Sequence, residues 1–191
     1  MDVIDAIKSR RSIGKVKRDP VSIELVEKVL EAATWAPCHH LTEPWRFFVM
    51  TGDGRKLLGK TLGKIAEEGM EDLTTVENQE KIRKQEEKAL RAPVIIAVAV
   101  TPSDNPRVER IEEFAAVNAA IQNMLLTAHA LGLGAVWRTG KPAYHPKMKE
   151  LFSLRDEDEV LGFVYMGYPD IEPPVRHRKP FAEKTIWMDS N

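Results

Sequence analysis

Adjacent arginine and serine side chains near the N-terminus form the first candidate for binding chemistry. Ser9, Arg10, Arg11 and Ser12 follow one another where a short N-terminal helix is expected to end. Two guanidinium groups beside hydroxyls present forked donors that match the oxygens of a phosphate. Cations also favour the C-terminal end of a helix macrodipole without any ligand, so helix-end stabilisation is the alternative to an anion site.

A second candidate follows the long apolar helix. Trp137, Arg138, Thr139 and Gly140 place an aromatic plane, a guanidinium, a hydroxyl and a flexible backbone at the end of one short strand. Such a set can hold a flat cofactor with polar edges, and the alternative is a Trp core anchor beside a surface arginine. The glycines before this segment close a helix ahead of a strand, which is the reverse of the dinucleotide fingerprint and excludes Rossmann binding here.

The loop that holds Cys38, His39 and His40 invites a metal or nucleophile hypothesis. A structural zinc site needs a second ligand pair, which the sequence does not offer, and adjacent histidines point apart on a regular element. A Cys–His nucleophile pair has no third orienting residue at a recognisable distance. We therefore expect no metal and no catalytic cysteine. His39 is interpreted as a stacking or hydrogen-bonding neighbour of a planar ligand, or else as a loop residue without a role.

The remaining charged runs are a basic patch at Arg176 to Lys179 and an acidic run at Asp156 to Glu159. The acidic run is typical of a solvated loop. Two basic patches far apart in the sequence, without interleaved aromatic residues, suit one small phosphate better than a nucleic-acid strand.

Composition narrows the classes of partner. The 191 residues include 28 basic and 29 acidic side chains, and the net charge of -1 provides no overall field for nucleic acid or an anionic membrane. The single cysteine excludes an intramolecular disulfide and favours a reducing compartment, so we expect a cytoplasmic protein. We expect neither a targeting segment nor a membrane span. The length fits one domain over residues 1–191.

The elements that must position these groups alternate irregularly along the chain. Helical periodicity and capping signals predict helices beginning at Asp2 and Ser22. The nearly all-apolar, alanine-rich middle of residues 109–131 predicts a long buried helix, and a small helix is expected over 146–151. Residues 55–90 are expected to form one or two solvated helices with little buried surface, which could serve as a mobile lid. Before them, a turn is expected in which Asp53 caps the next helix. The expected strands are 45–50, 93–100, 135–139 and 160–166.

This order, with helices clustered between widely spaced strands, predicts an α+β fold. The apolar run over 93–100 is expected to be a strand covered on both faces, which makes the sheet central. The proline-rich segment from Pro169 to Pro180 is expected to be extended. Because Ile186 and Trp187 near its end have nowhere obvious to pack on their own subunit, we expect this C-terminal tail to reach a partner chain.

Taken in order, these segments resemble the FMN-dependent nitroreductase family, most of all its small minimal members. The motifs are RRS after the first helix, APxH followed by EPWRF, GLGAVWRTG, VLGFVYMGYP and the tail HRKPF. The resemblance implies a three-layer fold with a central, mainly antiparallel sheet and helices on both sides. It also implies a homodimer with two FMN sites at the interface.

The resemblance further assigns roles to residues of this chain. It implies that Arg10, Arg11 and Ser12 hold the phosphate, ribityl chain and pyrimidine edge of FMN, with Arg178 as a late phosphate contact. It implies that Trp35 and His39 arrive from the other subunit, and that the isoalloxazine is lined by Trp137, Arg138 and Thr139. In relatives Asn and Gln stand where this chain has Leu41 and Glu43, so contacts made there do not transfer. The segment Lys60 to Leu90 corresponds to the variable, substrate-covering region.

The implied activity is a ping-pong transfer of hydride from NAD(P)H through FMN to a small electron acceptor such as a nitroaromatic or quinone. No protein residue is nominated as a catalytic acid, because solvent can supply protons. Two alternatives stay open. One is different flavin chemistry on the same fold, such as dehalogenation or flavin cleavage. The other is a cofactor-free dimeric binding module in which the basic run from Lys8 to Arg18 docks an acidic partner.

Overall fold

A four-stranded antiparallel sheet forms the centre of the molecule. The computed structural model describes residues 1–188, and its strands follow the order β1-β2-β4-β3. Each neighbouring pair in this order is antiparallel. The predicted strands are confirmed, with ends that differ by at most one residue. Their bounds are β1 (Trp45–Thr51), β2 (Val94–Val100), β3 (Gly134–Arg138) and β4 (Glu159–Gly167).

The strand β2 is buried along its whole length, as its continuous apolar sequence predicts. Its side chains alternate between two hydrophobic clusters, one on each face of the sheet. Val94, Ile96 and Val98 belong to the larger cluster, whereas Ile95 and Ala97 belong to the smaller one. A strand with apolar side chains on both faces is stable only between two layers of helices.

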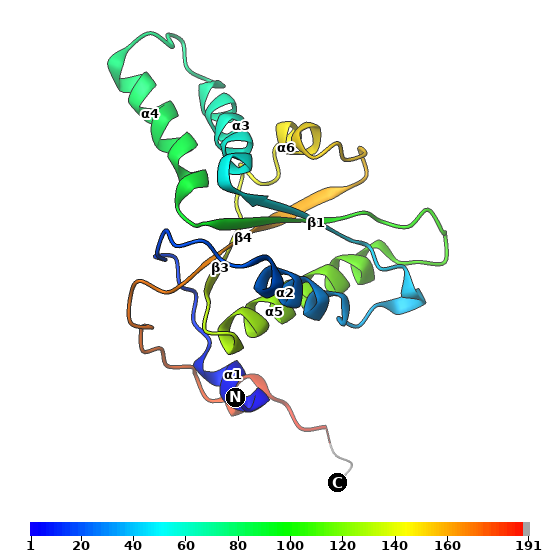
Figure 1. The fold of residues 1–191 in the computed structure, drawn as a ribbon. Helices are drawn as coiled ribbons and strands as arrows, with labels where there is room; N and C mark the ends of the chain where they lie inside the picture. Colours follow the sequence, from blue (N-terminus) through cyan, green and yellow to red (C-terminus); the bar gives the residue numbers. More distant parts are fainter. Residues whose placement is uncertain (189–191) are drawn as a thin grey trace.

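Helices supply those two layers (Figure 1). On one face lie α2 (Ile23–Thr34) and the long α5 (Arg110–Ala130), which pack against each other. On the other face lie α3 (Arg55–Glu67), α4 (Val76–Glu86) and α6 (Pro146–Leu151). The expected α+β, three-layer architecture is therefore confirmed.

Two local predictions between β1 and β2 are wrong. The helix α3 is not merely solvated, because Leu58 is fully buried and Leu62 nearly so in the smaller hydrophobic cluster. Only α4 has little buried surface, with Ile82 as its one buried residue. Asp53 does not cap α3; its carboxylate lies 2.7 Å from Nζ of Lys56, because Gly54 occupies the cap position.

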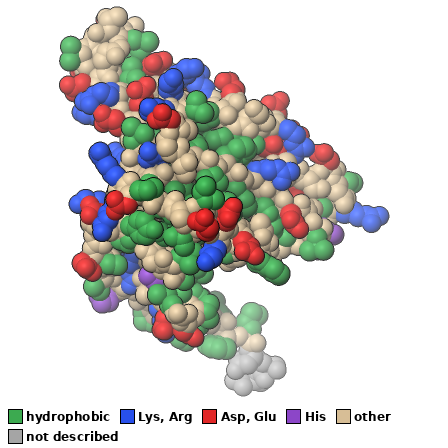
Figure 2. Space-filling model, viewed as in Figure 1, with side chains coloured by type: hydrophobic (Ala, Val, Ile, Leu, Met, Phe, Trp, Pro, Cys, Tyr) green, Lys and Arg blue, Asp and Glu red, His purple; other side chains and the backbone are tan. Residues whose placement is uncertain are grey.

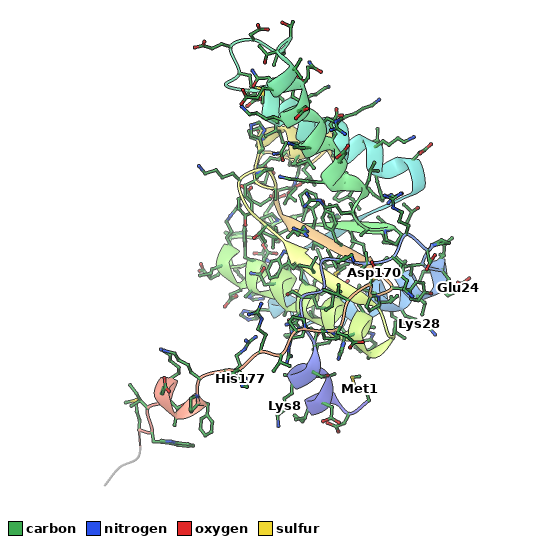
Figure 3. All side chains as sticks on the ribbon, turned by 90° about the vertical axis from the view of Figure 1, so that its left-hand side faces the viewer. Met1, Lys8, Glu24, Lys28, Asp170 and His177 are labelled. Carbon is green, nitrogen blue, oxygen red and sulfur yellow. The ribbon has the colours of Figure 1, made fainter. Side chains whose placement is uncertain are left out.

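The C-terminal tail leaves the body of the molecule. Its last described residues extend away from the sheet beyond His177 (Figure 3). Ile186 and Trp187 are 87% and 79% exposed. That the tail reaches a partner chain stays a prediction. Over residues 1–188, none of the helices combines the length and the apolar character that a membrane crossing requires.

Candidate functional site

The N-terminal segment brings its arginines to the outer edge of β3. The helix α1 (Val3–Ser9) begins at Asp2, whose carboxylate accepts a hydrogen bond of 2.7 Å from the backbone N–H of Ile4. After α1 ends, the chain turns and the N–H of Ile13 donates to the carbonyl of Ala135 in β3 at 2.9 Å. Gly134 allows this approach, because a Cβ there would lie 2.8 Å from a methyl group of Ile13.

A cavity of about 260 Å³ forms where this segment meets the C-terminal tail. We call it the arginine cavity, and it is lined by Arg10, Arg11, Ser12, Pro174, Arg176 and Arg178. The structure thus brings together the predicted Arg10, Arg11 and Ser12 with the distant Arg178. It adds Arg176, which the sequence marked only as part of a basic patch. No carboxylate lines this cavity, so its guanidinium groups repel one another.

Of the arginines that line the cavity, Arg10 is the one whose pKa is lowered by burial and by neighbouring charge. Its Nε is buried and has no hydrogen-bond partner within the described part of the chain. Desolvation, followed by the charges of Arg11 and Arg178, lowers the pKa of Arg10. Arg11 is held in place by carbonyls, donating 3.1 Å to Pro174 in the tail and 2.7 Å to Lys8. An anion in the cavity would satisfy the unpaired nitrogen and neutralise the repulsion.

The positive charges of Arg10 and Arg11 also act on His129, in the last turn of α5. Burial, followed by the charges of Arg10 and Arg11, lowers the pKa of His129. The hydroxyl of Ser9 lies 2.8 Å from Nε2 of this imidazole. The neutral form of His129 is therefore favoured beside the arginine cavity.

A second cavity, of about 250 Å³, lies at the end of β3 on the side of the sheet that α3 covers. We call it the β3 cavity. Its lining residues are Leu62, Gln85, Lys88, Arg91, Arg138, Thr139, Pro142, Ala143, Phe163 and Tyr165. Of the predicted residues, Arg138 and Thr139 lie here. Apolar walls around several converging polar groups are typical of a small-molecule site.

The β3 cavity is cationic. Arg138 has a buried Nε without a partner in the described residues, and its guanidinium lies 5.3 Å from the ring centre of Tyr165. Lys88 contacts the amide oxygen of Gln85. Burial, followed by the charges of Arg91 and Arg138, lowers the pKa of Lys88. Burial also raises the pKa of Tyr165, and the same two arginines oppose that rise.

The chain segment that runs along β3 contributes to the arginine cavity and contacts a residue of the β3 cavity. Ser12 lines the arginine cavity, and a Cβ on Gly14 would lie 3.1 Å from Nη2 of Arg138 in the β3 cavity. Two residues of extended chain span roughly 7 Å. One ligand with an anionic end and a planar end can therefore reach from one cavity to the other.

Trp137 does not line either cavity. Its side chain packs against the larger hydrophobic cluster, and its Nε1 donates to the carbonyl of Leu161 at 3.2 Å. In one subunit it is a core anchor, because consecutive residues of a strand point to opposite faces. Its predicted place against the isoalloxazine stays a prediction. The next residue of the strand, Arg138, is half-buried and is therefore not the surface arginine of the alternative interpretation.

His39 lies at the far end of α5 from the arginine cavity, whereas Trp35 directly follows α2 and is exposed. Nδ1 of His39 lies 2.6 Å from a carboxylate oxygen of Glu112, which is in the first turn of α5. Ser9 meets His129 in the last turn of the same helix. A helix of 21 residues is about 30 Å long at ~1.5 Å per residue. One subunit therefore cannot bring His39 to Arg10.

Sequence reasoning missed Gln85, Lys88, Arg91 and Tyr165. The signal for the first two was present: they stand three residues apart just before the buried strand β2, so one helical turn presents both toward the sheet. The lysine- and glutamate-rich composition of the whole segment concealed it. Tyr165 was part of a predicted buried strand, and only the pairing of β4 with β3 places it beside Arg138.

The fold and the two cavities define an α+β protein with two cationic cavities along the outer strand of its sheet. The model of the nitroreductase family matches residues 7–168. The chain belongs to that family. It is 35% identical to "Putative NAD(P)H nitroreductase YfhC" of Bacillus subtilis (strain 168), over 96% of this chain and 93% of that protein.

Solved structures agree with this membership. The crystal structure of a nitroreductase-like family protein from Bacillus cereus is 30% identical, with a TM-score of 0.85 and coverage of 100% of this chain and 97% of that one. A "putative nitroreductase in complex with fmn" from Desulfovibrio desulfuricans is 29% identical, with a TM-score of 0.71 and coverage of 100% and 99%.

Proposed function

We propose that this protein is an FMN-dependent oxidoreductase that uses NAD(P)H to reduce nitroaromatic or quinone-type acceptors in alternating half-reactions. The observation that carries the proposal is the pairing of an arginine cavity without carboxylates and a neighbouring cationic cavity along β3. The FMN complex of the similar Desulfovibrio protein and the name of the Bacillus subtilis relative support it.

The chain's own residues fit the cofactor at both ends. In the arginine cavity Arg10, Arg11 and Arg178 would hold the phosphate, with Ser12 next to it, and Nε of Arg10 would gain the partner it lacks. In the β3 cavity Arg138 and Thr139 would contact the isoalloxazine. Gln85 and Lys88 join them as proposed contacts to its polar edge.

Bound FMN would accept hydride from NAD(P)H and deliver reducing equivalents to an acceptor that takes the place of the nucleotide. The protein's part is to orient the ring and to stabilise negative charge on it. Lys88, Arg91 and Arg138 do the second task, because fixed cations in a partly dry cavity interact strongly with nearby charge. No side chain is needed as an acid, since solvent supplies protons.

A second copy of the chain would complete the site. Trp35 is 81% exposed, and Ile111 on α5 is 77% exposed. In the space-filling view, hydrophobic side chains lie among acidic and basic ones over α2 and α5 (Figure 2). Pairing two copies across these helices about a two-fold axis would bring the start of one α5 to the end of the other. Trp35 and His39 would then approach the partner's arginine cavity, and the exposed tail would pack on the partner.

The homodimer is tested by sedimentation of the purified chain at micromolar concentration. We expect a species of twice the chain mass. Replacing Ile111 with Glu on the exposed face of α5 is expected to give monomers that bind FMN poorly, although both cavities of the subunit are unchanged. A monomeric wild-type protein that binds FMN tightly would contradict this part of the proposal.

The cofactor and activity are tested by the absorbance spectrum of the dialysed protein, before and after addition of FMN. Under anaerobic conditions, NADH and NADPH are then added separately. We expect flavin bands that bleach with at least one nucleotide and return with a nitroaromatic or quinone. Protein that stays colourless after FMN addition and dialysis would sink the proposal and favour the binding module. Bleaching without turnover of these acceptors would direct product analysis to dehalogenation or flavin cleavage.

A further inference from the structure

A third cavity, of about 320 Å³, lies beside the β3 cavity and is strongly basic. We call it the basic cleft. Three segments that are distant in sequence build it: the chain after the bridge at Val16, the turn between β1 and α3, and the residues that precede β2. Its lining residues are Lys17, Arg18, Gly52, Asp53, Arg55, Lys56, Leu90, Arg91, Ala92 and Pro93.

Five cations face one carboxylate in this cleft, and that carboxylate is already paired. Asp53 lies 2.7 Å from Nζ of Lys56. Over residues 1–188, Lys17, Arg18 and Arg91 have no carboxylate oxygen within 4.0 Å of their charged nitrogens. The cleft therefore has a surplus of positive charge that is not compensated from within the chain.

One of these cations is held in position by the backbone. Arg55 donates 3.0 Å to the carbonyl of Gly52 and 2.6 Å to that of Ala92, which ties the turn after β1 to the start of β2. A guanidinium fixed in this way loses less freedom when it binds a ligand than a mobile surface lysine does. The cleft is thus partly pre-organised for an anion.

The cleft opens next to the site proposed for the flavin ring. Arg91 lines both the basic cleft and the β3 cavity. A ligand whose reactive ring stacks on the flavin at the β3 cavity would therefore extend its far end past Arg91 into the cleft. The reduced nicotinamide nucleotide is such a ligand, with a ring at one end and phosphates beyond it.

We propose that the basic cleft binds the phosphorylated adenosine end of NADPH and makes the protein prefer NADPH to NADH, an inference that rests on the proposed function. In Rossmann folds, a carboxylate against the ribose 2′-hydroxyl accompanies binding of NAD, whereas an arginine accommodates the 2′-phosphate of NADP, and the same charge complementarity applies to this cleft. The only carboxylate here, Asp53, is engaged by Lys56, and Lys17 and Arg18 are free to meet a phosphate.

Binding is tested first without any redox chemistry. The probes are adenosine 2′,5′-bisphosphate and 5′-AMP, titrated calorimetrically into the FMN-loaded protein. The variants are Arg18→Ser and Lys17→Ser, because Arg91 also lines the flavin cavity and would confuse the result. Arg107→Ser, an exposed arginine on the loop before α5, is the matched control.

We expect the wild type to bind the bisphosphate at least tenfold more tightly than 5′-AMP. Arg18→Ser should weaken the bisphosphate about tenfold, as loss of one charge-assisted contact at an exposed site implies, and Arg107→Ser should not. Equal affinity for the two probes, displacement of the bisphosphate by an equal concentration of inorganic phosphate, or equal losses in both arginine variants would overturn the proposal.

Anaerobic flavin reduction then separates this inference from the proposed function. We expect Arg18→Ser to lower the rate with subsaturating NADPH about tenfold and to leave the rate with NADH unchanged. Bleaching by both nucleotides with an unchanged NADPH to NADH ratio in the variant would refute the cleft assignment while supporting the flavin enzyme. Failure of both nucleotides to bleach bound FMN would refute the proposed function itself.

Discussion

The arginine cavity and the helix α4 contain the same kinds of charged side chain and arrange them in opposite ways. On α4, cations meet carboxylates one turn away: Lys81 lies 2.7 Å from Glu77, and Arg83 lies 2.7 Å from Glu87. In the arginine cavity four arginines converge and no carboxylate lines the wall. One region neutralises its own charge, and the other keeps a charge that only a ligand can neutralise.

This difference gives a criterion that distinguishes cations available for ligand binding from cations that are already paired with carboxylates of the same chain. Exposed helical pairs contribute only about 0.3–0.5 kcal/mol each, and they leave the surface nearly neutral. In the arginine cavity, burial, followed by the charges of Arg11 and Arg178, lowers the pKa of Arg10. Such repulsion persists in a folded protein where a bound anion offsets it.

The largest expected effect is on the free energy of unfolding, and it comes from the close contact between β4 and β3, the strand beside both cavities. Gly162 in β4 has a φ of +139°, and a Cβ there would lie 2.5 Å from the carbonyl oxygen of Arg138. We expect Gly162→Ala to lower the free energy of unfolding by about 3 kcal/mol or more, because the clash is with backbone. Urea denaturation measures this effect.

The matched control is Gly69→Ala in the turn between α3 and α4. This glycine also has a positive φ, +85°, but nothing lies within 4 Å of the position of a Cβ. Its cost should be about 1 kcal/mol, from backbone strain alone. Similar losses of stability in the two variants would show that the close contact between Gly162 and the carbonyl of Arg138 adds nothing to the cost of backbone strain.

The second prediction concerns the arginine cavity directly. Arg10→Ala should weaken FMN binding between about 10-fold and 100-fold, since a hydrogen bond to a charged group contributes ~1.5–3 kcal/mol. The rate of reduction by NADH per bound flavin should change much less. Fluorescence titration of FMN gives the affinity. If Arg10→Ala stays fully yellow through dialysis, the assignment of the phosphate to this cavity is wrong.

The third prediction concerns pH. Burial and the neighbouring arginines lower the pKa of His129 below its usual value of 6.5. As pH falls below about 6.5, the unfolded chain takes up a proton that the folded state resists, so stability of the FMN-free protein should decrease there. A bound phosphate should raise this pKa. NMR titration of the imidazole, with His129→Gln to assign its signal, checks both directions; a pKa that FMN leaves unchanged would place the phosphate elsewhere.

The smallest expected effect is on α4. Arg83→Ala removes one exposed ion pair and should change the free energy of unfolding by less than about 0.5 kcal/mol. It should leave FMN affinity unchanged, because the charge of Arg83 is compensated locally. Thermal unfolding and the same fluorescence titration measure both. A large loss of FMN binding in this variant would remove the contrast between the two regions.

Much of the fold could be predicted because its signals are local. The apolar run of β2, the alanine-rich apolar middle of α5 and the proline at the start of α6 each determine an element from neighbouring residues alone. The prediction for α3 was wrong, because its lysines suggested a solvated helix while Leu58 and Leu62, one turn apart, pack beneath the sheet. Sparse apolar positions become a buried face only when a tertiary partner is known.

The sequence by itself determined the chemistry available to this protein: paired arginines after a short helix, a Trp-Arg-Thr strand end, a basic tail and an α+β order of elements. Only the tertiary structure decided which of these groups meet. It placed Arg178 beside Arg10, turned Trp137 into the core, and added Gln85, Lys88 and Arg91 to Arg138. The physical reason is that residue types and local periodicity are encoded over a few positions, whereas a cavity forms where segments distant in sequence converge.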